Sequence, residues 1–158
     1  GNEFLEKVQL NIVGDGSYLE QWKNIVQEKK FRNIVFWGRK PREEIFKYLD
    51  ASDFLIVSLI DKEIFSLTVP AKTQTYIATN KPVIAIINGE ASKIVRENNL
   101  GLVCSPSDVQ QIKATFIKAI NTTNEEKNEY IRNSEFLTNN VFKKEIIIDN
   151  LLELLKRG

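Results

Sequence analysis

Five short apolar runs alternate with segments of helical spacing along this chain, and no other feature restricts its fold as strongly. Several runs are apolar at almost every position, which is typical of strands covered on both faces of a sheet. The runs occupy residues 8–13, 33–37, 54–59, 83–87 and 100–103. Short connections with intervening helices favour parallel strands. The sequence therefore predicts an α/β fold with a doubly wound, Rossmann-like parallel sheet.

The strand signals stop at residue 124. Apolar residues at helical spacing predict two extra carboxyl-terminal helices, broadly 124–138 and 142–156. The second helix has a broad apolar face that includes Phe142, Ile146 and Leu155. Packing against the same domain is the default explanation for this face, and contact with another domain is the alternative.

The composition is that of one globular domain. With 158 residues, 42% of them hydrophobic and 27% charged, the chain can bury a substantial core. A net charge of +1 argues against nucleic acid or anionic lipid as a partner. The basic turn 39–42 is explained equally well as a local anion site or as a solvated turn.

The chain contains no histidine and a single cysteine, Cys104. The first fact excludes histidine-dependent triads and histidine-based zinc sites from these residues. The second excludes an intrachain disulfide and a cysteine metal cluster, and Cys104 is best explained as a buried small hydrophobe. We expect no metal and no cofactor. We see no signal peptide and no apolar run long enough to span a bilayer, and we expect a cytoplasmic protein.

A loop and a helix start lie between the third and fourth apolar runs. Pro70 belongs in the first helical turn, with Ser66 or Thr68 as its cap, and Asn80 is expected to end the helix in a left-handed conformation. The free amides and the dipole of a helix start favour an anion, and Lys72 can lean over the same end. This combination suggests a phosphate or diphosphate ligand; a solvated Lys72 is the alternative.

Other turns and helix ends carry weaker signals. Gly14 and Gly16 form a Gly-x-Gly turn after the first strand, which allows the backbone to approach a ligand. Ser17 is expected to cap the next helix, and we assign Trp22 of that helix to the core. The spacing from Ser107 to Gln110 resembles a capping box.

Ligands of doubly wound sheets lie beyond the carboxyl ends of the strands. Four turns of this sequence leave such ends, namely 14–17, 38–41, 60–69 and 88–92. We therefore expect these turns to meet at one rim.

A series of motifs, taken in order, resembles a known family. The motifs are Ile-Val-Gly-Asp-Gly (12–16), Val-Phe-Trp-Gly (35–38), Tyr-Leu-Asp-Ala-Ser-Asp (48–53), Phe-Ser-Leu-Thr-Val-Pro-Ala-Lys (65–72), Tyr-Ile-Ala-Thr-Asn-Lys-Pro-Val-Ile-Ala (76–85), Asn-Gly-Glu (88–90) and Gly-Leu-Val-Cys-Ser-Pro-Ser-Asp (101–108). They resemble the carboxyl-terminal, donor-binding domain of family 4 GT-B glycosyltransferases. The resemblance is strongest to bacterial enzymes of capsule or O-antigen (lipopolysaccharide) synthesis, among them N-acetyl-L-fucosamine transferases.

This resemblance implies a nucleotide-diphosphate-sugar donor, with a UDP-sugar expected, and transfer with retention of configuration and without an obligatory metal. It places the donor by parts: the base near Phe36, Trp37, Gly38 and Arg39, the diphosphate at Leu67, Thr68 and Val69, and the sugar near Phe65 and Ser66. The diphosphate position coincides with the anion site that the helix start predicts.

Three positions depart from the family pattern. Leu67 and Thr75 occupy places where many relatives carry glutamates, the second of which holds the ribose hydroxyls. Thr75 can still hydrogen-bond a ribose hydroxyl, and Glu63 is a substitute for the first glutamate from the preceding loop. Lys93 stands where relatives often have glutamate.

The resemblance also implies that other parts of the enzyme are missing. GT-B enzymes close two domains over the reaction, and this chain lacks the amino-terminal, acceptor-binding domain and the first strand and helix of the donor domain. We therefore expect an inactive fragment of a longer enzyme. The full enzyme would take a sugar or lipid-linked sugar acceptor and associate peripherally with the inner face of the cytoplasmic membrane.

Two other functions remain open. The first is a nucleotide-sugar epimerase of the related two-domain fold. This interpretation is weakened because the catalytic carboxylates and histidine of that family have no match here. A receiver-like regulatory module needs clustered acidic residues after the first strand, whereas Asp15 is isolated.

Overall fold

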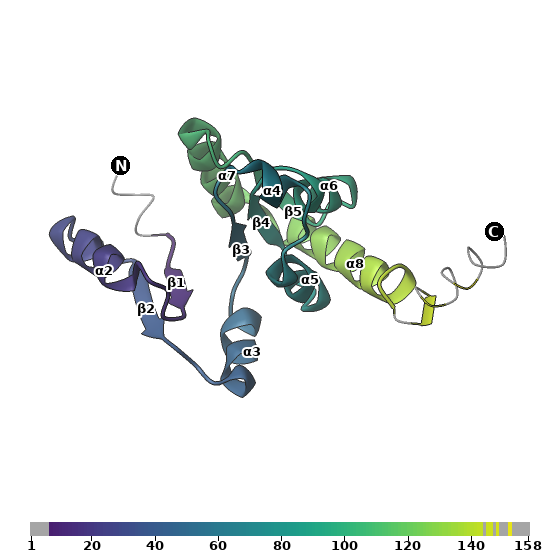
Figure 1. Cartoon of the computed structure of the whole chain (residues 1–158), viewed down its shortest axis with the longest axis horizontal. Helices are drawn as coiled ribbons and strands as arrows, with labels where there is room; N and C mark the ends of the chain where they lie inside the picture. Colours follow the sequence, from purple (N-terminus) through teal and green to yellow (C-terminus); the bar gives the residue numbers. More distant parts are fainter. Residues whose placement is uncertain (1–6, 144, 147, 149–151, 153–158) are drawn as a thin grey trace. The chain divides into compact units, whose positions relative to one another are not determined.

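The computed structural model in Figure 1 describes residues 7–143 together with 145, 146, 148 and 152. The chain divides into two compact units, Gly1–Tyr48 and Leu49–Gly158. Helix α3 (Arg42–Asp50) runs from the first unit into the second. Most of the carboxyl-terminal helix expected at 142–156 lies outside the described residues.

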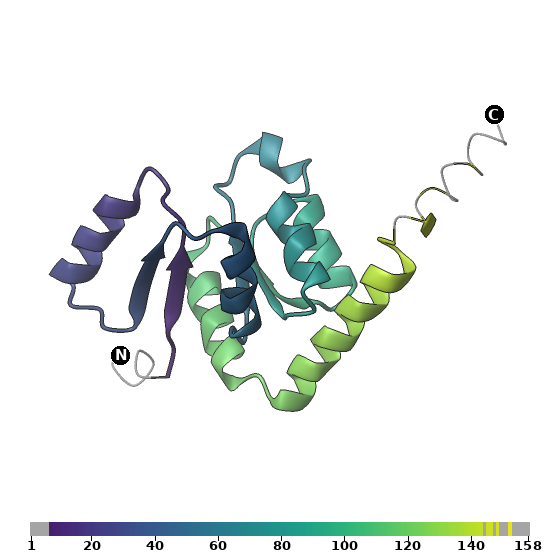
Figure 2. The same ribbon diagram turned by 90° about the horizontal axis from the view of Figure 1, so that it is seen from below.

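The described part of the first unit contains one parallel strand pair, helix α2 (Leu19–Glu28) and most of α3. Strands β1 (Leu10–Val13) and β2 (Ile34–Gly38) pair from Leu10 opposite Ile34, with an irregularity between Ile12 and Val13. Figure 2 shows the two strands side by side, with α2 alongside them.

Two local predictions for α2 are wrong. Tyr18, not Ser17, occupies the N-cap position and makes no side-chain cap bond, and Trp22 is 56% exposed instead of in the core. A two-stranded sheet offers too little apolar surface to cover a whole helix face, and α2 has no buried residue.

The second unit is built on a three-stranded parallel sheet in the order β3-β4-β5. Its elements are β3 (Leu55–Ser58), α4 (Glu63–Ser66), α5 (Ala71–Ala78), β4 (Val83–Ile86), α6 (Glu90–Glu97), β5 (Gly101–Cys104), α7 (Val109–Asn121) and α8 (Asn124–Asn140). Leu55 lies opposite Val83, and Val83 opposite Gly101, so the three strands start and end together. All the loops that leave their carboxyl ends therefore lie along one edge of this sheet.

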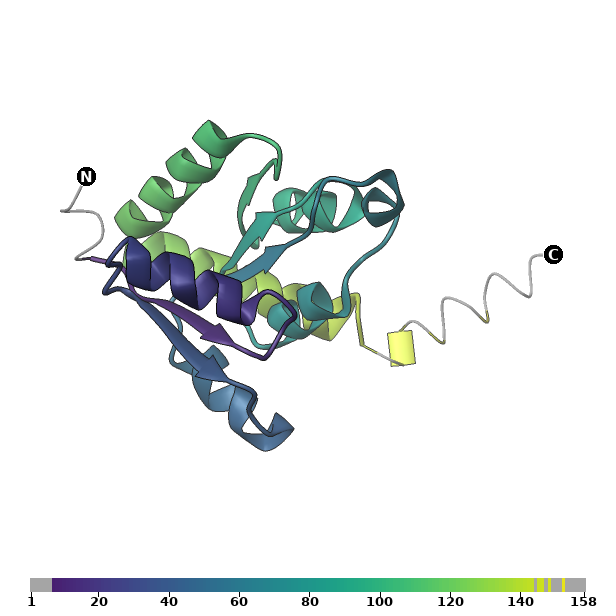
Figure 3. The ribbon, with the colours of Figure 1, turned by 60° about the vertical axis from the view of Figure 1, so that its left-hand side comes forward.

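Both faces of this sheet are buried, as the apolar runs predict. Successive residues of β4 alternate between two core clusters, with Val83 and Ala85 in one and Ile84 in the other. Figure 3 shows α6 and α7 on opposite sides of the strands. Helix α8 contributes Tyr130 to one cluster and Leu137 to the other, so it serves both faces.

The α/β class and all five strands are confirmed, while the pairing of those strands gives two sheets of two and three strands. Asn80 has a φ of 55° at the end of α5, and Cys104 is buried, as predicted.

Two buried hydroxyls mark the packing of α5 against α8, which lie next to one another in Figure 1. Thr73 of α5 and Ser134 of α8 are fully buried, and neither hydroxyl has a hydrogen-bond partner in the described part of the chain. An unsatisfied buried polar group carries its full desolvation cost.

Removing these hydroxyls is expected to stabilise the second unit. Thr73→Val keeps the shape of the side chain, and together with Ser134→Ala we expect a gain of about 1 kcal/mol in a urea titration. The matched control is Thr79→Val, because the Thr79 hydroxyl donates to the Tyr76 carbonyl at 2.7 Å and its loss should destabilise. Equal effects of the two changes would contradict the interpretation.

Candidate functional site

The Gly14 and Gly38 turns meet at the carboxyl ends of β1 and β2. The Gly14 amide donates to the Gly38 carbonyl at 2.8 Å, and both residues have positive φ, 137° and 67°. A side-chain Cβ at Gly14, Gly16 or Gly38 would meet no atom within 4 Å. The backbone is therefore open to a ligand at this end of the strand pair.

Side chains next to these turns are held in place by polar contacts. Trp37 is 42% exposed, and its indole N–H donates to the Asn11 carboxamide oxygen at 2.9 Å. Its ring lies 5.3 Å from that of Tyr48. Arg39 forms an exposed ion pair with Asp15 at 3.7 Å. An oriented, partly exposed indole and a nearby guanidinium suit a planar, anionic ligand.

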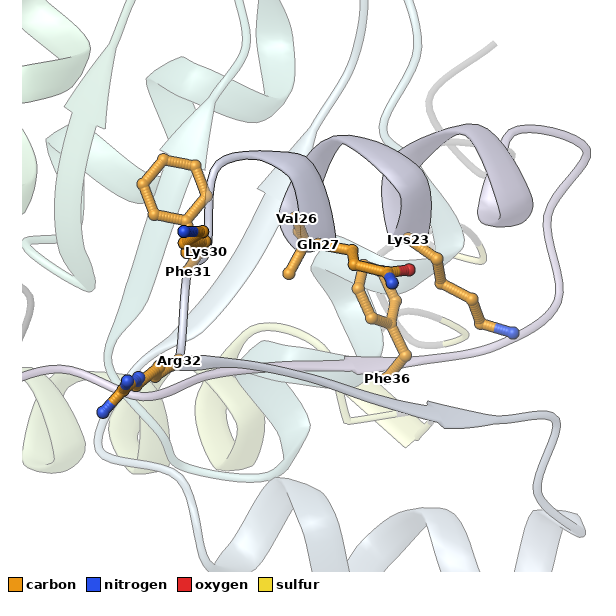
Figure 4. Close-up of a pocket in the computed structure, with 7 residues that line it drawn as sticks. All are labelled: Lys23, Val26, Gln27, Lys30, Phe31, Arg32 and Phe36. Atoms are coloured by element: carbon orange, nitrogen blue, oxygen red, sulfur yellow. The ribbon is translucent and has the colours of Figure 1, made fainter.

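Phe36 lies elsewhere in this unit. Figure 4 shows its ring pointing from β2 toward α2, below Val26 and Gln27. There it lines a hollow of about 330 Å³, whose other lining residues are Lys23, Lys30, Phe31 and Arg32. Arg32 precedes β2, so this hollow extends toward the amino end of the strand, away from the glycine turns at its carboxyl end.

In the second unit, α4 and the loop after it occupy the connection from β3 to α5. Phe65 and Ser66 end α4, and Leu67, Thr68 and Val69 form the loop. Leu67 is 76% exposed. The segment assigned to the sugar and diphosphate thus lies beyond the carboxyl end of β3.

The expected capping of α5 is wrong in detail. Pro70 is the N-cap residue, one position before the first helical residue, and no side chain caps the helix. The Ser66 hydroxyl donates to the Glu63 carbonyl at 2.7 Å, and that of Thr68 to the Phe65 carbonyl at 3.4 Å. Both hydroxyls are used within the turn of α4, so they do not reach the start of α5.

The missing cap leaves the start of α5 available. In the described part of the chain, the amides of Ala71 and Lys72 have no hydrogen-bond acceptor, and the Lys72 side chain is exposed. Thr75, one turn later, is exposed, and its hydroxyl donates to the Ala71 carbonyl at 3.0 Å. Unpaired amides, a helix dipole and a nearby ammonium group form a favourable position for an anion.

A polar contact among three loops was not predicted. The Asp61 carboxylate lies in the loop after β3. It accepts a hydrogen bond at 3.0 Å from the side-chain amide of Asn88, in the loop after β4, and another from the hydroxyl of Ser107, in the loop after β5. The bond from Ser107, followed by that from Asn88, lowers the pKa of the Asp61 carboxyl below its ordinary value. The only available signal was that each residue shortly follows a strand.

The role predicted for Ser107 is therefore wrong. Asp108 is the N-cap of α7 and accepts from the Gln111 amide at 2.9 Å. A carboxylate one residue later satisfies the helix end, and the Ser107 hydroxyl bonds across to Asp61 instead.

Gly89 brings the β4–α6 loop into backbone contact with α4. A Cβ at Gly89 would lie 1.9 Å from the Ser66 carbonyl oxygen, which excludes any side chain there without movement. Its φ of 80° and ψ of −151° lie in a region that is essentially restricted to glycine. On the following helix, Lys93 donates to Glu90 at 2.6 Å, which raises the pKa of Lys93.

The structure brings the predicted site residues together in two groups. One is at the carboxyl ends of β1 and β2, and the other lies beyond β3 in the second unit. The meeting of the two groups at a single rim stays a prediction. Among the described residues there is no cluster of three Cys, Asp or Glu side chains suited to a metal, and none of their helices is long and apolar enough to cross a membrane.

The parallel strands, with open turns and an uncapped helix start beyond their carboxyl ends, place this chain in the class of Rossmann-like α/β domains. The sequence matches the model of the glycosyl transferases group 1 family over residues 3–135, and the chain belongs to that family. The resemblance to glycosyltransferases is thus confirmed at this level.

Similar sequences and solved structures are consistent with this family assignment. The chain is 31% identical over 105 residues to the probable glycosyltransferase WbjE of Pseudomonas aeruginosa, which covers 65% of this chain and 26% of WbjE. It is 26% identical over 112 residues to the amylovoran biosynthesis glycosyltransferase AmsK of Erwinia amylovora, covering 70% and 28% of the two chains. The crystal structure of Anabaena HepE in complex with UDP superposes with a TM-score of 0.77 at 17% identity, over 100% of this chain and 45% of HepE.

The similarity to HepE supports a Rossmann-like half of a GT-B fold. This chain spans between a quarter and a third of the length of WbjE and AmsK, and under half of HepE.

Proposed function

We propose that this chain is the donor-binding domain of a retaining, family 4 glycosyltransferase that builds a bacterial surface polysaccharide. Its donor is a UDP-sugar. The sequence motifs resemble those of N-acetyl-L-fucosamine transferases, so we propose transfer of a sugar of that type. Family membership supports transferase chemistry. The name of AmsK, which refers to amylovoran biosynthesis, and the HepE complexes with UDP and UDP-glucose support the polysaccharide role and the donor.

One observation carries the proposal: at the uncapped, exposed start of α5, the amides of Ala71 and Lys72 have no acceptor among the residues that the structure describes. The donor diphosphate binds along Leu67, Thr68 and Val69 to these amides, and Lys72 contributes a charge-assisted contact. The sugar lies toward Phe65 and Ser66, and Thr75 offers its hydroxyl oxygen to the ribose.

The base belongs to the other group of residues, near Trp37, Gly38 and Arg39, with the Gly14 and Gly16 turn beside it. Phe36 contributes backbone groups only, because its side chain points toward α2. No metal or cofactor is required in this proposal.

We also propose a longer donor domain, because the family resemblance implies a first strand and helix that are missing here. The described residues supply a two-stranded and a three-stranded parallel sheet.

The remaining parts of the activity belong to the longer enzyme. An amino-terminal domain takes the sugar or lipid-linked acceptor at the inner face of the cytoplasmic membrane, and these 158 residues alone are inactive in transfer.

Titration calorimetry with UDP, GDP and ADP tests the donor. We expect UDP to bind with a micromolar to millimolar Kd and more tightly than the other two. Lys72→Ala should weaken UDP roughly 10- to 150-fold, since a hydrogen bond to a charged group contributes roughly 1.5–3 kcal/mol. Lys113→Ala, an exposed lysine on α7, is the matched control.

Absence of UDP binding to the unmodified chain would contradict the proposed donor. Binding that is equal in Lys72→Ala and the unmodified chain would remove Lys72 from the site and leave the backbone amides as the anion contact.

A further inference from the structure

We infer that Asp61 is a positioning residue, whose carboxylate joins the loops after β3, β4 and β5 and thereby fixes the segment 61–69 for the donor. This inference rests on the proposed function for its consequence in ligand binding. The three residues Asp61, Asn88 and Ser107 form what we call the clamp, and all its contacts lie within the second unit.

The clamp spans three neighbouring strands. Oδ1 of Asp61 accepts from the Asn88 carboxamide at 3.0 Å, and Oδ2 accepts from the Ser107 hydroxyl. Each oxygen of one carboxylate is thus used by a different loop. Hydrogen bonds to an ionised group are roughly twice as strong as neutral ones, so a carboxylate is well suited to this position.

The loop after β4 contacts the segment 61–69 at a second place. Asn88 bonds to Asp61, and its neighbour Gly89 packs its backbone directly against the backbone of Ser66. The pair 88–89 therefore contacts both ends of the stretch from Asp61 to Ser66, which contains α4. A hollow of about 10 Å³, room for about one water, lies between these loops.

The charge of Asp61 makes a direct role in anion binding unfavourable. A carboxylate repels a diphosphate, and both of its oxygens already accept hydrogen bonds from protein groups. Its role is to hold the loop that leads to Leu67 and to the start of α5. A loop held in its bound conformation loses less entropy when a ligand binds.

Amide hydrogen exchange of the 158-residue chain tests the clamp without any ligand. Asp61→Ala removes both bonds, and we expect exchange of the amides in 61–69 to accelerate at least tenfold while the β4 amides are unchanged. Asp61→Asn should largely retain protection, because an amide can accept from Asn88 and donate to the Ser107 oxygen. The control is Glu125→Gln, the same loss of charge at a residue of α8 whose side chain makes no hydrogen bond in the described part of the chain.

UDP titration of the same variants tests the consequence. We expect about a tenfold weaker Kd for Asp61→Ala and a change below threefold for Asp61→Asn. Rescue by the conservative variant separates positioning by hydrogen bonds from a requirement for the charge itself.

Unchanged exchange in 61–69 for both Asp61→Ala and Ser107→Ala would overturn the clamp, and the serine variant answers the question if the aspartate variant fails to fold. If UDP does not bind the unmodified chain, the proposed donor is wrong, while the exchange rates still decide the clamp. If UDP binds the unmodified chain and Asp61→Ala equally well, the positioning role is overturned even though the donor is correct.

Discussion

Gly89→Ala is expected to lower the free energy of unfolding of the second unit by roughly 3 kcal/mol and to abolish UDP binding in the micromolar to millimolar range. Two costs add. The backbone at φ 80° and ψ −151° is essentially restricted to glycine, a strain of about 1–3 kcal/mol for another residue. The new Cβ would also lie 1.9 Å from the Ser66 carbonyl oxygen, and overpacking typically costs about 1–3 kcal/mol.

The relief of that clash explains the loss of binding. The atoms that a Cβ would meet are the Ser66 carbonyl oxygen, carbonyl carbon and Cα, all of which are backbone and cannot rotate away. Either α4 or the β4–α6 loop must shift. A shift of α4 moves the loop at Leu67 to Val69, which leads to the start of α5.

NMR signals of β4 through a urea titration measure this prediction, because β4 is buried in the second unit. Gly16→Ala is the control for the loss of a glycine. A Cβ at Gly16 meets no atom within 4 Å, so we expect no measurable change of β4 stability. A Gly89→Ala chain as stable as the unmodified one would show that the Ser66 contact does not constrain the loop.

Local patterns predicted the elements of this fold well. All five strands are found at the apolar runs, because short runs rich in β-branched residues between turn signals favour strands over helices. Asn80 ends α5 with a left-handed φ, as its place before Lys81 and Pro82 indicates. These features depend only on residues that are near one another in the sequence.

Features that depend on distant residues were not predictable. The pattern Ser107 to Gln110 and the pattern Thr123 to Glu126 look alike, yet only the second forms a capping box. The Ser107 hydroxyl instead meets Asp61, 46 residues away. Local spacing contains no information on which loop from another strand lies next to a hydroxyl.

The same limit applies to the site and to Trp22. The sequence indicated that the 60–69 and 88–92 turns share an edge, and the contacts of Asp61 and Gly89 confirm that they do. It did not indicate that backbone atoms of Ser66 and Gly89 touch, since that depends on the exact packing of α4. Trp22 has core spacing on α2, but burial requires an apolar surface opposite, and the two-stranded sheet leaves Trp22 exposed.

Ile77→Ala is expected to cost about 2–5 kcal/mol, because it removes a large side chain from a core that cannot close over the space. Ile77 is 1% exposed and belongs to the cluster that joins α5 to β3, β4 and α8. Urea unfolding of β4 measures the loss of stability. The control is Ile117→Ala on α7, where the side chain is 42% exposed, and it should change stability by less than about 0.5 kcal/mol.

UDP affinity should also fall in Ile77→Ala, since this side chain anchors the helix whose first amides are the proposed diphosphate contact. Retained affinity in a destabilised variant would mean that the start of α5 is held by the 61–69 segment and not by the core beneath the helix.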